Sequence, residues 1–376
     1  MNNPVPDPNT PTDAQDTQDT QPAVRSINLA LQGGGSHGAF TWGVLDTLLL
    51  DNRIRIDGIS GASAGAVNAV ALANGYAQVA QKDFASDDPR ELARASLARL
   101  WRGVTGIGGL GALTQGVVRL LLGNWHAEHL GGQILGNAMS RWISPYQANP
   151  LDINPLRKLL DEQIDFAALA RLASPRVFVS ATHVRTGRAD IFSGKRLTLQ
   201  AVMASTCLPN IFQAVEIDGE AYWDGGFSAN PPLVPLINAC EARDIVLVQI
   251  NPLQRAQTPQ TPQEIMDRIN ELTFNASLLA QMRDIDFINR LIDDGRLQDG
   301  DSYKRLYLHR IDGGAAMEDM PASGKLSTDT AMIERLFEMG QSSAKRWLAS
   351  NFDALGRQST INIRRDYVGN MPTSTR

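Results

Sequence analysis

Three glycine-rich segments hold the residues of this chain that are best suited to chemistry. They are GGGSHG at Gly33–Gly38, GASAG at Gly61–Gly65 and DGG at Asp224–Gly226. The second segment fits the pattern G-x-S-x-G, in which a strand turns sharply into a helix and exposes a serine hydroxyl as a nucleophile. Gly61 and Gly65 lack the Cβ atoms that would obstruct such a turn. Ser63 is therefore the candidate nucleophile, although a buried serine at the start of an alanine-rich helix would carry the same five letters.

A serine nucleophile needs a base, for which the chain offers one well-placed aspartate and five histidines. The histidines are His37, His126, His129, His183 and His309. His309 follows Asp224, as the Ser–Asp–His order of the α/β-hydrolases requires, but it falls inside the predicted strand KRLYLHRI. Gly225 and Gly226 allow the backbone around Asp224 to turn tightly, and a carboxylate held against a serine hydroxyl can act as its general base. We predict a Ser63–Asp224 pair.

The glycine run at Gly33–Gly38 allows two interpretations. Gly33, Gly35 and Gly38 match the dinucleotide-binding pattern G-x-G-x-x-G, and Asp57 lies at about the distance of its ribose-binding acid. The strand that contains Asp57 continues, however, into the serine turn. In the second interpretation the backbone N–H groups of Gly33, Gly34, Gly35 and Ser36, together with that of Ala64, bind the oxyanion of an acyl-transfer intermediate. We favour the second because it also explains why GASAG follows.

The segments around these motifs predict an α/β fold. Residues 26–31 and 54–60 are typical of buried parallel strands, and each is followed by a glycine-rich turn and a helical pattern. Further strands are predicted at 176–184 and within 244–252, and helices at about 262–297 and 329–348. Residues of about 82–172 are predicted to form helices and loops inserted near the site. The expected architecture has three layers, α/β/α, with a mainly parallel central sheet and an inserted helical region.

Composition limits the class of protein and its surroundings. The chain has 376 residues, 43% of them hydrophobic, and a formal net charge of −5, which argues against a nucleic-acid partner. Residues 1–25 are rich in Pro, Asp, Gln and Thr and are predicted to be disordered. Residues 26–350 are expected to form the catalytic domain and 351–376 a loosely structured tail. The chain contains neither a signal-peptide core nor a spanning apolar stretch, so we expect a cytoplasmic protein, peripheral at most to a membrane.

The order and spacing of the three motifs resemble those of the patatin-like phospholipase family. The likeness extends through AVMASTCLPNIFQAVEIDGEAYWDGGFSANPP and covers about residues 27–252. It implies a serine acyl hydrolase that cleaves fatty-acyl esters of phospholipids or related lipids through an acyl-enzyme. On this resemblance Ser63 corresponds to the nucleophile, Asp224 to the base and the Gly33–Gly35 run to the oxyanion loop. No cofactor and no metal is implied; a transacylase or a thioesterase of the same fold is the alternative.

Some residues depart from this pattern or allow a second interpretation. His37 stands where the family usually has Arg or Lys; it could support the oxyanion loop when protonated, or pack as an ordinary buried side chain. His126, Glu128 and His129 have near-helical spacing, but we expect a surface helix there rather than a metal site.

The expected partner is a lipid ester at a membrane or micelle surface, whereas the sequence leaves the oligomeric state open. The apolar insertion at 103–136, with Leu120–Leu122, is the predicted membrane contact, and Trp101, Trp125 and Trp142 could form a lid or pack in the core. Nothing around Cys207 indicates an activated thiol.

Overall fold

The computed structural model describes residues 24–79, 88–106, 144–300, 303–318, 320 and 329–369. Within these ranges strands and helices alternate along much of the chain. The strands are β1 (Arg25–Leu31), β2 (Ile54–Gly61), β3 (Arg176–His183), β4 (Ala189–Phe192), β5 (Val215–Ile217), β6 (Glu220–Asp224), β7 (Asp244–Gln249) and β8 (Tyr307–Asp312). The helices are α1 (Gly38–Leu50), α2 (Ala64–Val79), α3 (Pro89–Gly106), α6 (Pro145–Ala148), α7 (Pro155–Gln163), α8 (Phe166–Leu169), α9 (Leu199–Ser205), α10 (Val234–Ala239), α11 (Pro262–Asp293), α12 (Ala315–Glu318) and α13 (Thr330–Asn351).

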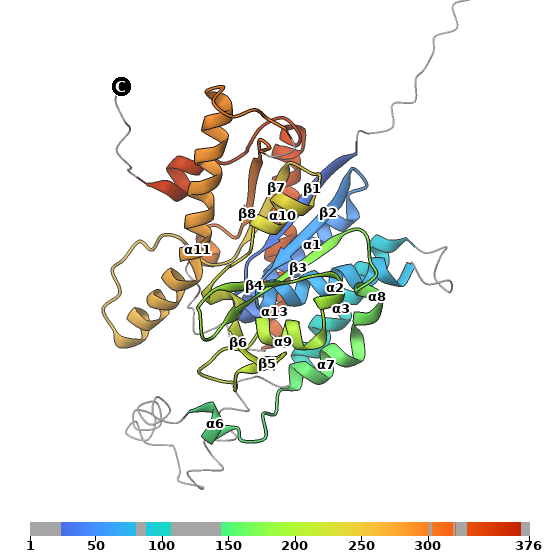
Figure 1. The fold of residues 1–376 in the computed structure, drawn as a ribbon, viewed down its shortest axis with the longest axis vertical. Helices are drawn as coiled ribbons and strands as arrows, with labels where there is room; N and C mark the ends of the chain where they lie inside the picture. Colours follow the sequence, from blue (N-terminus) through green and yellow to red (C-terminus); the bar gives the residue numbers. More distant parts are fainter. Residues whose placement is uncertain are drawn as a thin grey trace, which may run out of the picture.

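A single sheet connects all the described strands. Its order is β5-β6-β3-β2-β1-β7-β8, and β4 pairs with β3 beside this path. The pairings from β3 through β2, β1 and β7 to β8 are parallel, whereas β4, β5 and β6 join by antiparallel pairing. The sheet is therefore mainly parallel, as predicted. Because β1 and β2 are neighbours and run the same way, the turns that follow them lie side by side at one edge of the sheet (Figure 1).

Alternating side chains of the parallel strands build a core on each face of the sheet. Ile27, Leu29 and Leu31 of β1 pack in one core, with apolar residues of α1, α2, α3 and α13. Ala30 belongs to the second core, with residues of α10 and α11 such as Leu236 and Leu278. Figure 1 shows the sheet between these two groups of helices. Burial on both faces explains the nearly continuous apolar sequence of β1, and the predicted three-layer α/β/α architecture is confirmed.

Helices α1 and α13 cross at two glycines that bring their backbones into contact. A Cβ atom added to Gly43 of α1 would overlap the carbonyl oxygen of Phe337 in α13. A Cβ atom added to Gly340 of α13 would overlap the carbonyl oxygen of Phe40 in α1. Each helix therefore packs where the other has no side chain, and this contact holds the C-terminal helix against the one that follows the glycine loop.

The segment after α13 differs from the loosely structured tail that the sequence suggested, at least as far as residue 369. The Thr360 N–H donates to the Leu308 carbonyl at 3.0 Å and the Gly356 N–H donates to Asp244 at 2.9 Å. Tyr367, in a short helical turn (Arg364–Val368), is buried and its hydroxyl donates to Gln249 at 2.8 Å. The segment gains its order by packing along β7 and β8, which its own polar composition does not reveal.

Several expectations fall on parts of the chain outside the described residues. The tail before residue 24 and most of the 103–136 insertion, including Leu120–Leu122, are among them, as are Trp125, His126, Glu128, His129 and Trp142. The described parts of the region 82–172 contain α3, α6, α7 and α8 and no strand.

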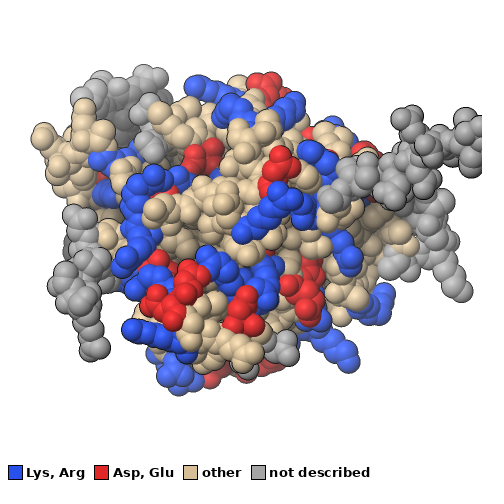
Figure 2. Space-filling model, turned by 90° about the horizontal axis from the view of Figure 1, so that it is seen from above, with Lys and Arg blue, Asp and Glu red and all other residues tan. Residues whose placement is uncertain are grey.

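Charged side chains of both signs mix on the face shown in Figure 2. Blue and red groups alternate there over short distances, so the described residues of this face do not form a large field of one sign. Separately, none of the helices in the described ranges has the length and apolar character needed to cross a bilayer.

The helix crossing yields a stability prediction. Gly340→Ala should lower the free energy of unfolding by about 1–3 kcal/mol, because the new methyl group overlaps the α1 backbone and forces the helices apart. Urea denaturation followed by circular dichroism measures the change. Gly106→Ala is the matched control, since nothing lies within 4 Å of its added Cβ and it ends a helix. Equal stability of Gly340→Ala and the unmodified chain would contradict the close crossing.

Candidate active site

Ser63 occupies a sharp turn between β2 and α2. Its φ of 53° lies in the left-handed region, which is uncommon for a residue with a side chain. The flanking glycines are required by contact, because a Cβ atom on Gly61 would overlap the backbone of Gly65, and one on Gly65 would overlap the carbonyl of Leu31. The turn thus has the strand–turn–helix geometry that the G-x-S-x-G pattern predicts.

Hydrogen bonds hold this turn in its strained conformation. The Ser63 N–H donates to the hydroxyl of Ser205 at 2.9 Å, and Ser205 is fully buried at the end of α9. The Gly65 N–H donates to the Ala62 carbonyl at 2.8 Å, and the Val67 N–H donates to the Ser63 carbonyl at 3.1 Å. The Ser205 hydroxyl is the partner that comes from another element, so α9 helps to set the position of Ser63.

Asp224 lies at the end of β6 and is fully buried. Its backbone is fixed on both sides, since its N–H donates to the Cys207 carbonyl and its carbonyl accepts from the Thr182 hydroxyl, both at 2.7 Å. Its carboxylate accepts from the Gly226 N–H at 2.7 Å. Gly225 has to be glycine, because a Cβ atom there would overlap the Ser180 carbonyl. The tight turn expected of the DGG segment is therefore present.

The structure brings Ser63 and Asp224 together. Burial raises the pKa of the Asp224 carboxyl to about 7, while the neighbouring Ser63 side chain and the Gly226 N–H limit the rise. A carboxyl with a pKa near neutrality can exchange a proton with an adjacent hydroxyl under mild conditions. The arrangement can therefore support proton transfer from Ser63 to Asp224.

The glycine loop after β1 approaches the Ser63 turn closely, but its first N–H is already occupied. A Cβ atom on Gly33 would come within 2.5 Å of the Ala62 carbonyl oxygen. The Gly33 N–H donates to the Asn230 side chain at 2.6 Å, and the Gly33 carbonyl accepts from the Asn251 side chain at 2.7 Å. Gly33 is thus clamped by two asparagines, and its expected role as an oxyanion donor does not fit this geometry.

The later residues of the glycine loop, Gly35 and Ser36, face the cavity into which Ser63 opens. Gly35, Ser36 and Ala64 line the same cavity as Ser63. Gly35 has a φ of 58°, and Gly34 packs so closely on Ile250 that a Cβ atom would come within 2.9 Å of its Cδ1 atom.

A network of buried side-chain amides supports the loop from behind. The Gln32 side-chain oxygen accepts from the Ile250 N–H at 3.0 Å and from the Asn251 N–H at 2.8 Å. The Gln32 amide group donates to Asn275 of α11 at 2.8 Å. The network ties the ends of β1 and β7 together. The motifs by themselves did not indicate Ser205, Asn230, Gln32 or Asn251. Ser205 and Asn230 lie within residues 201–232, which resemble the family, so that resemblance was the one signal that could have found them.

Ser63 opens into a small, mostly apolar cavity of about 100 Å³. Its wall is formed by residues of the glycine loop, the Ser63 turn, α2, α3 and α7, and of the segments just before α7 and after α9. They are Gly35, Ser36, Ser63, Ala64, Val67, Trp101, Val104, Asn154, Leu156, Thr206, Leu208, Ile211 and Phe212. This lining includes no charged side chain and no histidine, so the cavity suits an apolar group such as an acyl chain. Trp101 is buried here and donates to Asn68 at 3.0 Å, so it is a wall residue rather than a mobile lid.

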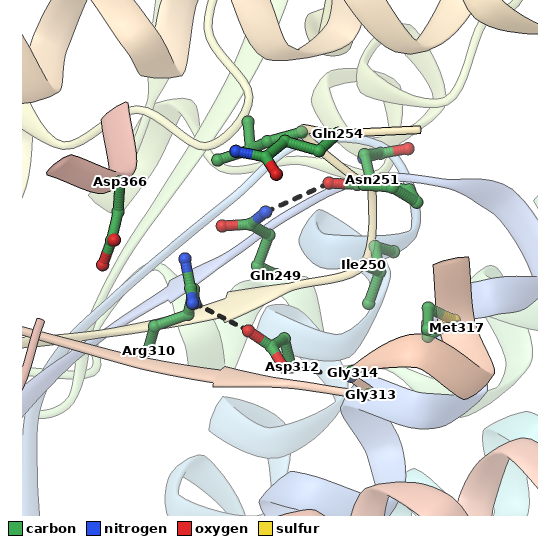
Figure 3. Close-up of a pocket in the computed structure, with 12 residues that line it drawn as sticks. Gln249, Ile250, Asn251, Gln254, Arg310, Asp312, Gly313, Gly314, Met317 and Asp366 are labelled. Carbon is green, nitrogen blue, oxygen red and sulfur yellow. Dashed lines mark hydrogen bonds and ion pairs between the residues drawn. The ribbon is translucent and has the colours of Figure 1, made fainter. Parts of the chain in front are cut away.

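A second, polar pocket of about 230 Å³ lies at the ends of β7 and β8 (Figure 3). Arg310 and Asp312 form an ion pair across it at 2.6 Å, and Gln249 donates to the Asn251 carbonyl at 3.2 Å. Asn251 is also the residue that donates to Gly33. This pocket does not include Ser63, and its polar side chains bind one another behind the glycine loop.

None of the described histidines lines the Ser63 cavity. His309 is fully buried on β8, three strands from β2, where it contacts Asp244 at 2.9 Å and Thr360 at 3.1 Å. His183 on β3 lies 3.1 Å from Glu220. His37 is buried in the one-turn helix that follows the glycine loop. The Ser–Asp–His alternative therefore lacks its histidine in the described part of the chain.

The remaining residues considered from the sequence, Asp57 and Cys207, have structural surroundings that do not suit a functional role. Asp57 accepts from the N–H groups of Glu241 and Ala242 at 2.7 and 2.8 Å, within β2 rather than at its end, so it is not available to a ribose. Burial raises the pKa of the Cys207 thiol to about 12, which disfavours a thiolate. The described residues include no group of three or more side chains suited to holding a metal ion.

Comparisons with known proteins identify the family. A solved structure, VipD from Legionella pneumophila, is similar at a TM-score of 0.41 and 17% sequence identity, over 88% of this chain and 67% of that one. No curated protein sequence matches the chain. The family model for the patatin-like phospholipases matches residues 29–237, which include the glycine loop, the Ser63 turn and Asp224. The chain is thus a member of the patatin-like phospholipase family and has the general character of a lipid acyl hydrolase.

Proposed function

We propose that this protein hydrolyses fatty-acyl esters of phospholipids or related lipids with Ser63 as nucleophile and Asp224 as base. One observation supports this proposal above the others. Ser63 lies at a strained turn in the wall of an apolar cavity, next to a buried carboxylate whose pKa is raised to about 7. A nucleophile, its base and a binding site for an acyl chain thus occur together.

In the first step, Asp224 takes the proton of the Ser63 hydroxyl while the Ser63 oxygen attacks the ester carbonyl carbon. Attack forms a tetrahedral oxyanion. When it collapses, the bond to the alkoxide oxygen breaks, that oxygen takes the proton from Asp224 and leaves as the alcohol, and the acyl group stays on Ser63. In the second step Asp224 takes a proton from water, the hydroxide attacks the acyl-enzyme, and Ser63 recovers its proton as the fatty acid leaves. The same base therefore serves both half-reactions.

Backbone N–H groups of the glycine loop and of the α2 N-terminus are the proposed oxyanion donors. Gly34, Gly35 and Ser36 follow the clamped Gly33, and Ala64 begins α2, whose first N–H groups have no partner within the helix. The partial positive charge of the α2 N-terminus favours negative charge beside Ser63. A loop already held by Asn230 and Asn251 would need little rearrangement when the oxyanion forms.

The first prediction separates the proposed pair from a histidine-dependent mechanism. Ser63→Ala and Asp224→Asn should each reduce kcat on short-chain nitrophenyl esters by at least about 10³-fold, because residues that act as a unit fail together. His183→Gln, at a buried histidine outside the cavity, should keep most of the activity. Circular dichroism checks that each variant is folded. Substantial turnover by folded Asp224→Asn would exclude Asp224 as the base.

The second prediction concerns pH. Since Asp224 must be ionised to accept a proton, kcat/KM should rise with pH and level off above about 7. The same pKa affects stability, because a carboxyl whose pKa is higher in the folded chain binds its proton more tightly when folded. The fold therefore loses stability as pH rises from about 3.8 through about 7.

Asp224→Asn tests this pKa independently of turnover, since the amide stays neutral and can still accept from Gly226. It should melt at a higher temperature than the unmodified chain at about pH 8.5, and at nearly the same temperature at about pH 4. A constant difference in melting temperature across this range would show that Asp224 does not titrate near neutrality.

The third prediction concerns Ser205 as a positioning residue. Ser205→Ala removes the acceptor of the Ser63 N–H, so it should lower kcat about tenfold, or about 1.4 kcal/mol in the barrier, with little change in KM. Labelling of Ser63 by a fluorophosphonate should slow to the same extent. Ser96→Ala is the matched control, because Ser96 is also a buried serine that accepts a hydrogen bond, from Asn74, away from the cavity. An unchanged kcat in Ser205→Ala would show that the contact is only structural.

A further inference from the structure

Exposed apolar side chains gather on two segments, the loop at residues 144–153 and the first half of α11. Thirteen large apolar residues are exposed in the described part of the chain, and seven of them lie either in residues 144–153 or in the first half of α11. They are Tyr146, Leu151, Ile153, Ile265, Met266, Ile269 and Leu272. Single exposed apolar residues are ordinary on a protein surface, but groups of them mark contacts with another apolar surface.

The first segment is a closed loop that holds its apolar side chains outward. The Asn149 side chain accepts from the Ile153 N–H at 3.0 Å and donates to the Ile153 carbonyl at 3.1 Å. The Asp152 N–H donates to the Asn149 carbonyl at 3.0 Å. These bonds close the loop and leave Leu151 at its tip, where its side chain is 79% exposed.

This loop continues the wall of the Ser63 cavity. The Gln213 side chain donates to the Asn149 carbonyl at 2.8 Å, and the Ala214 N–H donates to the Tyr146 hydroxyl at 3.3 Å. Residues on either side of these contacts, Phe212 and Asn154, line the cavity itself. The exposed loop is therefore attached beside the wall of the apolar cavity.

The first half of α11 presents the second group on one helix face. Ile265, Ile269 and Leu272 have the spacing i, i+4, i+7 and are all exposed. Phe274, two residues after Leu272, packs on Phe227 with ring centroids 5.3 Å apart. Because Phe227 lies three residues after Asp224, this contact ties α11 to the Asp224 turn. In Figure 1 this half of α11 and α6 both lie beyond the ends at which β1 and β2 lead into the glycine loop and the Ser63 turn.

We propose that this apolar end of the molecule rests on the surface of a zwitterionic or neutral lipid aggregate. The apolar end is defined by six residues, Tyr146, Leu151, Ile153, Ile265, Ile269 and Leu272. The assignment rests on the proposed function, because a lipid ester has to pass from its aggregate into the Ser63 cavity, beside which the 144–153 loop is attached.

The charges near the apolar end decide which lipid it fits. Beside the loop, Asp152 has the guanidinium of Arg157 near it. On α11, Glu264 caps the helix N-terminus, Asp267 is acidic, and Arg268 is bound to the buried Glu271 at 3.1 Å. These charges are of both signs and partly paired, so they give anionic head groups no net attraction. Contact therefore depends on insertion of apolar side chains into the lipid, and it should be nearly independent of salt.

Flotation of the full chain with phosphatidylcholine vesicles tests the surface. Leu151→Gln with Ile153→Gln, and separately Ile269→Gln with Leu272→Gln, should each weaken partitioning about tenfold, since each pair removes two large apolar groups. Val24→Gln with Leu50→Gln is the matched control, because both residues are exposed and lie away from the C-terminal ends of the strands. Salt at about 0.5 M should leave the binding of the unmodified chain unchanged.

Further measurements separate this surface from the chemistry. Ser63→Ala should bind vesicles as the unmodified chain does, and both paired variants should keep their turnover of soluble short-chain esters while losing turnover of vesicle phospholipid. Normal vesicle binding by both pairs would overturn the proposal. So would loss of the soluble activity, or light scattering that shows a dimer which the pairs convert to monomers. If the pairs behave as expected but Ser63→Ala still hydrolyses esters, the surface stands and the proposed function fails.

Discussion

The site depends on one turn, around Ser63, whose flanking positions have no space for a side chain. β2 enters α2 through Ser63 in a left-handed conformation, and Gly61 and Gly65 contact backbone where any Cβ atom would overlap. Gly33 approaches the same turn from the end of β1. Because β1 and β2 are adjacent parallel strands, their following turns meet, and close packing of glycines brings the loop N–H groups and the serine hydroxyl to one place. The rest of the molecule holds these two turns together.

Burial of Asp224 connects stability with the proposed chemistry. Removing its carboxyl from water raises its pKa to about 7, which suits a base at neutral pH but disfavours the charged form in the fold. The hydrogen bond from the Gly226 N–H and the neighbouring Ser63 side chain offset part of that cost, and contacts to the Asp224 backbone hold the turn in place. The proposed base is therefore maintained by the packing of β3, β6 and the end of α9 around it. The same packing leaves an apolar cavity with no competing charge in its lining.

Two differences between expectation and structure have a common cause. The glycine run was expected to supply all its N–H groups to an oxyanion, yet Asn230, distant in the sequence by 197 positions, accepts the first of them. Residues beyond 351 were expected to be loose, yet Thr360 and Tyr367 bind to β7 and β8. In both cases a polar group forms a hydrogen bond with a residue far away in the sequence. Such pairings cannot be predicted from local composition and spacing.

The sequence by itself determined the order of strands and helices around the three motifs, the mainly parallel sheet, and the identity of Ser63 and Asp224 as the candidate pair. These follow from local rules, because apolar periodicity, glycine at sharp turns and serine between strand and helix act over a few residues. Only the tertiary structure decided that Asp224 is fully buried beside Ser63 and that Ser205, Gln32 and Asn251 hold the turns. The physical reason is that burial and long-range hydrogen bonds arise from chain segments that meet only when the whole sheet and both helical layers have assembled.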